Sequence, residues 1–159
     1  MHTYGFHLLD FLPNAVACMA FFAHLCEGFA GVLPSTALFR HYFTPRIQPG
    51  GAISGCITWI LRTQNKGTYP EVSQKERWDE WWGRWCWIEE ADPLEFCRVR
   101  RRPPFLSKDW GNLDGDDEKL TVAITRIHHL TSARLTLNMI GADLIRRRIA
   151  PLHNKGWPA

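Results

Sequence analysis

The stretch HLCEGFAGVLPSTALFRHYF, residues 24–43, decides the fold because it joins two apolar segments through a short interruption. Gly31 and Pro34 lie in this interruption. Neither residue favours the interior of a helix, since glycine is too free in conformation and proline lacks the backbone N–H. The pattern therefore predicts a helical hairpin over residues 13–43, made of a helix, a turn and a second helix.

Capping residues set the expected bounds of this hairpin. Asn14 is the predicted N-cap of the first helix, which is apolar on nearly all sides and runs to about Gly28. Ser35 or Thr36 can cap the second helix, which is expected to run through residue 43 and end before Pro45. A helix that is apolar all round is typical of the middle of a domain.

Three polar or reactive residues lie near the end of the first helix: His24, Cys26 and Glu27. His24 and Cys26 diverge by about 200° on a helix, so they are not expected to share a zinc ion. Glu27 is predicted to be structural and to pair with a basic side chain or a backbone donor, since a buried carboxylate without a partner costs on the order of several kcal/mol. The same polar residues interrupt the apolar run and predict a buried helix rather than a membrane span.

Residues 44–90 are expected to contain loops and strands. Proline and glycine in residues 44–55 favour a loop, and the alternation in residues 57–61 favours a strand. The tryptophans of residues 78–87 fit either a helix or a strand, because both spacings occur among them. We favour a strand over residues 84–90, with Trp85 and Trp87 as structural residues of a small tryptophan-rich sheet.

The rest of the chain is predicted to be a charged loop followed by helices. Residues 91–115 form the basic and acidic loop, and residues 116–150 the helices. Leu120, Ile124, Ile127 and Leu130 form one apolar stripe. The buried side of the second helix is expected to consist of Leu137, Ile140, Leu144 and Ile145, with Arg146, Arg147 and Arg148 near its C-terminal end and Pro151 as its stop.

These elements predict one domain over residues 1–159, of α+β class and predominantly helical. The N-terminal hairpin and the C-terminal helix pair would pack around the small sheet. Five cysteines without a C-x-x-C pair indicate a reducing compartment, and neither a disulfide framework nor a metal site is expected. The net charge of +3 is too small to indicate nucleic-acid binding by itself.

Three segments together carry a resemblance to a known family. They are YGFHLLDFLPNAVACMAFFAHLCEGFAGVLPSTALFRHYF (residues 4–43), WCWIEEADP (residues 85–93) and MIGADLIRRRIAPL (residues 139–152). The combination resembles the gypsy-type transposon domain that occurs in large numbers in plant genomes and is sometimes labelled a transposase. The sharpest matches are LCEGF at residues 25–29 and LIRRR at residues 144–148, and Gly28 replaces a common alanine. The resemblance implies a retroelement-derived protein and a fragment of a longer reading frame.

The chemistry suggested by the name transposase has no counterpart in the sequence. A two-metal integrase would need an aspartate followed about 35 residues later by a glutamate, and we find none. The reverse transcriptase pattern Tyr-x-Asp-Asp and the aspartic protease pattern Asp-Thr/Ser-Gly are also missing. The stretch NLDGDDE, residues 112–118, lacks two of the oxygen ligands that a calcium loop needs. No enzyme activity, catalytic residue or cofactor is therefore expected.

The expected function is that of a structural or interaction domain inside the cell, in the nucleus or cytoplasm. Its partner would be an unknown protein or a second copy, with no membrane involved. The alternative is a nucleic-acid-binding module, in which guanidinium groups contact phosphates. Its candidate residues are Arg98, Arg100, Arg101, Arg102, Arg146, Arg147 and Arg148. A third possibility, a divergent nuclease, would need Asp79, Asp114 and Asp117 to converge on a metal.

Overall fold

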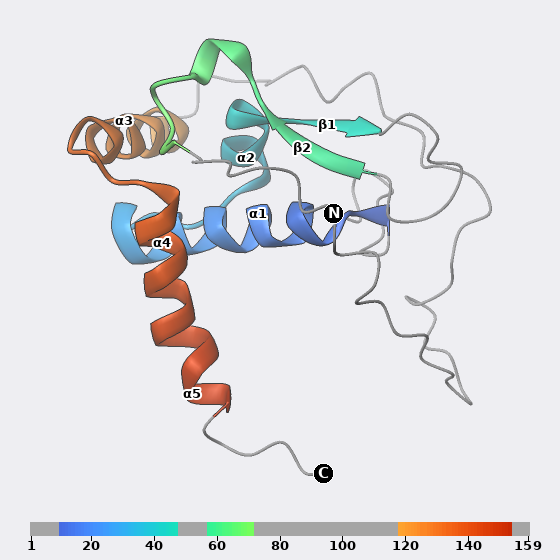
Figure 1. The fold of residues 1–159 in the computed structure, drawn as a ribbon. Helices are drawn as coiled ribbons and strands as arrows, with labels where there is room; N and C mark the ends of the chain where they lie inside the picture. Colours follow the sequence, from blue (N-terminus) through green and yellow to red (C-terminus); the bar gives the residue numbers. More distant parts are fainter. Residues whose placement is uncertain (1–9, 48–56, 72–117, 154–159) are drawn as a thin grey trace.

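The computed structural model describes residues 10–47, 57–71 and 118–153. In these ranges a two-stranded sheet lies beside a group of helices (Figure 1). The α+β class and the predominance of helix are confirmed. The elements in chain order are α1 (Pro13–His24), η3 (Leu25–Ala30), α2 (Thr36–Tyr42), β1 (Phe43–Ile47), β2 (Ile57–Leu61), η4 (Thr63–Asn65), α3 (Glu118–Ser132), α4 (Leu137–Leu144), η8 (Ile145–Ile149) and α5 (Ala150–His153).

The predicted helical hairpin is present, but its first helix begins earlier than expected. Pro13 is the first helical residue and Leu12 the N-cap, so the expected N-cap Asn14 lies inside α1. Proline is favoured at the first helical position, because its fixed φ suits the helix and its missing N–H would have no helical partner there. The Leu12 N–H instead donates to the Ile57 carbonyl at 2.9 Å, which ties the helix start to β2.

The first helix also continues beyond Gly28, as the six-residue π-helix η3. It ends at Gly31, whose φ of 61° is the left-handed conformation that glycine adopts readily. The break predicted at this glycine is confirmed. The second helix, α2, is capped by Ser35, whose Oγ accepts a hydrogen bond from the Leu38 N–H at 3.1 Å.

The sheet pairs β1 with β2 in antiparallel register, from Phe43 opposite Leu61 to Ile47 opposite Ile57. The predicted strand at residues 57–61 is confirmed, whereas the loop expected from residue 44 is wrong for residues 44–47. Pro45 lies within β1, opposite Trp59. A proline fits a strand that has a neighbour on one side only, because its missing N–H can lie on the unpaired edge. The strand expected at residues 84–90, with Trp85 and Trp87, lies outside the described residues.

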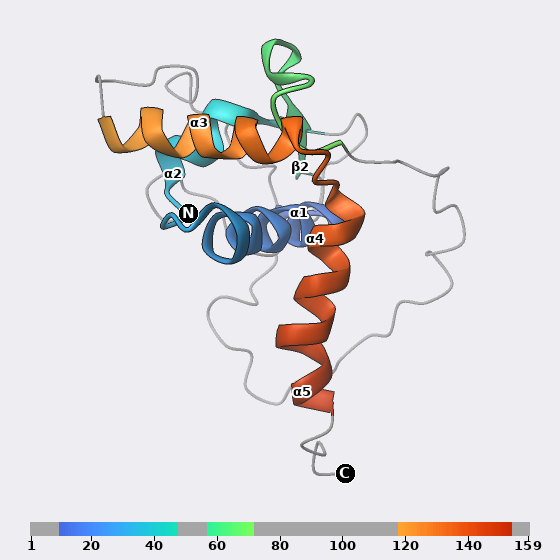
Figure 2. The same cartoon turned by 90° about the vertical axis from the view of Figure 1, so that its left-hand side faces the viewer.

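The C-terminal helices follow the predicted pattern with two corrections. Pro151 does not stop the helix but lies in α5, two residues after the last residue of the π-helix η8. Ile145, expected on the buried side, is 58% exposed. The reason is geometric, since η8 and α5 extend beyond the other described elements in both views (Figures 1 and 2). The stripe predicted along α3 is confirmed: Ile127 is buried, and Leu120, Ile124 and Leu130 pack against the core.

Aromatic rings form a large part of the core between the hairpin and the sheet. The Phe39 ring stacks on Phe43 at 4.8 Å between centroids and meets the edges of Phe22 and Trp59. Tyr42 packs on Tyr69 at 4.8 Å. Such ring pairs add about 0.5–1.5 kcal/mol each beyond the area they bury. In the ranges described, no helix combines the length and the apolar character that crossing a membrane requires.

Candidate functional site: a polar contact between the first and last helices

Two polar links join the N-terminal hairpin to the C-terminal helix. The first is a hydrogen bond between the His24 ring Nε2 and Asp143 Oδ2 at 3.0 Å. His24 is the last residue of α1 and is buried, and Asp143 lies near the end of α4. Gly141 faces the Phe21 ring where the two helices cross, and the ring lies 3.4 Å from the place a Cβ would occupy. The contact therefore fixes the crossing of α1 and α4.

The second link is an ion pair between Glu27 Oε2 and Arg148 Nη2. Glu27 lies on η3 and Arg148 on η8, so this link comes three residues after His24 in the hairpin and five residues after Asp143 in the C-terminal helix. Glu27 was predicted to pair with a basic side chain or a backbone donor, and in the structure it contacts the Arg148 guanidinium. Its structural role stays a prediction. The carboxylate is exposed rather than buried, however, and its partner comes from the far end of the chain.

Asp143 is the centre of this contact, because three basic side chains approach it. Besides His24, Arg147 Nε donates to Oδ1 at 2.9 Å and Arg146 Nη2 lies 3.6 Å from the same oxygen. Partial burial raises the pKa of the Asp143 carboxyl, but the hydrogen bonds from His24 and Arg147 and their charge outweigh burial. The net pKa lies below the ordinary value, so Asp143 is ionised at neutral pH.

The chemical capacity of this contact is limited by its neighbours. Burial, with a smaller effect of the Glu27 charge, raises the pKa of the Cys26 thiol to about 12, and an un-ionised thiol is a poor nucleophile. The other ring nitrogen of His24, Nδ1, is buried without a hydrogen-bond partner among the described residues. Within the same residues no three His, Cys, Asp or Glu side chains converge as a metal site would require.

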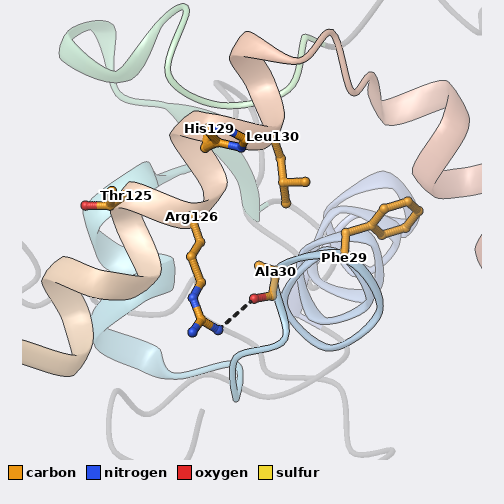
Figure 3. A pocket seen from close by; sticks show the side chains of 6 residues that line it. All are labelled: Phe29, Ala30, Thr125, Arg126, His129 and Leu130. Carbon is orange, nitrogen blue, oxygen red and sulfur yellow. Dashed lines mark hydrogen bonds between the residues drawn. The ribbon is translucent and has the colours of Figure 1, made fainter.

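A shallow hollow of about 330 Å³ lies between η3 and α3 (Figure 3). Arg126 crosses it from α3, and its Nη1 donates to the Ala30 and Gly31 carbonyls at 3.1 Å each. Leu130 points the same way, toward η3, whereas the Thr125 hydroxyl points away (Figure 3). The guanidinium satisfies carbonyls at the C-terminal end of a helix, which is where a cation is electrostatically favourable. Arg126 therefore gives the hollow a structural role, because its guanidinium connects α3 to the C-terminal end of η3.

The structure separates the predicted arginines into two groups. Arg98, Arg100, Arg101 and Arg102 lie outside the described residues. Arg146, Arg147 and Arg148 lie on η8, and each approaches a carboxylate, although the Arg146 and Arg147 side chains are 77% and 64% exposed. The sequence reasoning missed Asp143 as their partner. The available signal was its isolation, since it is the only acidic residue after Glu118.

The geometry defines a small α+β domain in which residues 24–27 contact residues 143–148. The family described as "Putative gypsy type transposon" has a model that matches residues 1–47, and so confirms the resemblance for the N-terminal hairpin. No curated protein and no solved structure matches the chain. The chain is therefore similar, over its first 47 residues, to a gypsy-type transposon family.

Proposed function

We propose that the chain is a non-enzymatic structural or interaction domain of a gypsy-type transposon-derived protein and that it acts on a protein partner inside the cell. The observation that carries the proposal is that the polar residues of the two helices form ion pairs and hydrogen bonds with one another. Glu27 pairs with Arg148, and His24 and Arg147 with Asp143. These contacts hold the first and last helices together. A fixed arrangement of helices is what an interaction domain needs in order to present a binding surface.

The rival function is nucleic-acid binding, and one observation favours it. The exposed guanidiniums of Arg146 and Arg147 retain donors that a phosphate could accept from. Their charge is offset, however, by Asp143, and that of Arg148 by Glu27. Three arginines and two carboxylates at this contact leave a formal charge of +1 from these five side chains. A single surplus charge is a weak electrostatic footprint for a nucleic acid.

The test is a titration of the folded chain with labelled DNA and RNA, single- and double-stranded, across a salt series. Arg146→Glu is the informative variant, because this side chain is the most exposed of the three and does not bridge the two helices. Lys66→Glu changes an exposed residue elsewhere by the same charge and serves as the control.

The proposal expects no binding at about 0.15 M salt tighter than the ~10⁻⁴ M of weak non-specific association. Tighter binding that weakens steeply with salt, is lost in Arg146→Glu and survives in Lys66→Glu would instead establish the nucleic-acid module.

A further inference from the structure

The hollow between η3 and α3 is lined by a cation without an acidic neighbour. Arg126 and His129 line it from α3, and no acidic side chain is among the described residues that surround it (Figure 3). On η3, Glu27 pairs with Arg148 instead. On α3, Glu118 precedes Arg126 by eight residues, or about 12 Å along the helix axis. In the part of the chain that the structure describes, no carboxylate therefore pairs with Arg126.

The exposed guanidinium of Arg126 still has donors to offer. Its hydrogen bonds to the Ala30 and Gly31 carbonyls, at 3.1 Å each, both come from Nη1. Nε and Nη2 carry the remaining N–H groups, which form a fork that matches the two oxygens of a carboxylate. The carbonyls offset only part of the positive charge, since the C-terminal end of a helix is equivalent to about half an elementary negative charge. A carboxylate is therefore the group that fits the unused edge of Arg126.

The size and openness of the hollow decide which carboxylate fits. Its volume of about 330 Å³ is at the low end of the roughly 300–1,000 Å³ of ligand pockets. Because such pockets cover about 70–90% of their ligand, a shallow hollow suits a group attached to a larger molecule outside it. Phe29 and Leu130 add apolar surface, and Leu130 points toward η3 (Figure 3). The last residue of a polypeptide combines a carboxylate with an adjacent side chain that can be apolar, whereas Asp and Glu side chains do not.

We propose that the hollow is a binding site for the C-terminal carboxylate and the aliphatic last side chain of a partner protein. The carboxylate meets Nε and Nη2 of Arg126, and the side chain packs on Leu130 and Phe29. His129 follows Arg126 by three residues, so it lies on the same face of α3, at the rim of the hollow. The inference rests on the proposed function and names the chemical group that the partner presents. For this single residue we expect a Kd on the order of 1 mM.

The test is a titration of the full chain with a short peptide that ends in leucine with a free carboxylate, followed through the backbone amide NMR signals. The same peptide with an amidated end keeps the shape without the charge, and acetate has the charge without the side chain. His129→Glu places a negative charge at the rim. Its matched control is His128→Glu, at the adjacent exposed residue that does not line the hollow. Arg126→Lys keeps the charge and removes the fork.

The expected result is saturating shifts of the amide signals of residues 29–30 and 125–130, with about tenfold weaker binding of the amidated peptide and of acetate. His129→Glu and Arg126→Lys should each weaken binding about fivefold, whereas His128→Glu should leave it unchanged.

Equal binding of the amidated peptide, or equal effects of the two histidine substitutions, would overturn the inference. So would equal binding of acetate, which would indicate an adventitious ion only, or signal shifts confined to residues away from the hollow. Failure of the peptide with no nucleic-acid binding overturns this inference alone, whereas Arg146-dependent nucleic-acid binding overturns the proposed function.

Discussion

Glu27 and Arg148 are 121 positions apart in the sequence, and their side chains form an ion pair between η3 and η8. Glu27 comes from LCEGF, which lies within the residues 1–47 that match the gypsy-type transposon family, and Arg148 comes from LIRRR at residues 144–148. The His24–Asp143 hydrogen bond lies beside this pair. Distinctive residues at the two ends of the chain therefore contact each other, and the contact defines how the last helix crosses the first.

Acid is expected to weaken the contact at Asp143. Its pKa is lower in the folded chain than the ordinary value of 3.8, so the ionised carboxylate stabilises the fold. That stabilisation is fully present above pH 3.8 and is lost as the pH falls through the folded-state pKa. Denaturant unfolding of the wild type and Asp143→Asn at a series of pH values measures it.

The difference in unfolding free energy between the two proteins should shrink as the pH falls below about 4. Because an asparagine side chain does not titrate, the Asp143→Asn variant itself should show a weaker acid dependence. A difference that stays constant down to about pH 2.5 would show that the carboxylate charge contributes nothing to stability.

Gly31 is expected to be sensitive to side chains. Its φ of 61° ends η3, and its carbonyl accepts a hydrogen bond from Arg126. Gly31→Ala should destabilise the chain by about 1 kcal/mol, because Cβ disfavours the left-handed conformation. Gly31→Asn should cost less, since asparagine tolerates this conformation better. Equal midpoints of urea unfolding for wild type and Gly31→Ala would contradict the geometry of this turn.

Cys18 and Cys26 should resist alkylation in the folded chain. Burial raises the pKa of both thiols to about 12, with a further contribution from the Glu27 charge at Cys26. At pH 8 the reactive thiolate is then about one part in ten thousand. Labelling with iodoacetamide, followed by peptide mapping, should modify these two cysteines only after denaturant is added. Rapid labelling of either one without denaturant would show that its segment opens readily.

Local patterns were sufficient to predict much of the fold. The hairpin, β2 and the stripe along α3 follow from helix breaks, alternation and helical spacing, which depend on residues close in sequence. The strand β1 was missed because Pro45 argues against a strand unless the strand has an unpaired edge. Periodicity wrongly assigned Ile145 to a buried face. The error arises because periodicity does not indicate how far a helix extends beyond its neighbours.

The candidate site was less predictable, because its contacts span the chain. Glu27 was expected to find a basic partner, but a single sequence does not identify Arg148 among the available arginines. The pairing of His24 with Asp143 bridges 119 positions and depends on how α1 and α4 cross. That crossing results from tertiary packing, which no local rule encodes.

The measurement that tests the central claim most directly is a double-mutant cycle on Glu27 and Arg148. Glu27→Gln, Arg148→Gln and the double variant are unfolded in denaturant at low salt and again at about 1 M NaCl. Both side chains are more than a third exposed, 38% and 54%, so we predict a coupling free energy of only about 0.5 kcal/mol that decreases with salt. Strictly additive effects of the two substitutions at low salt would contradict the claim that these residues join the first and last helices.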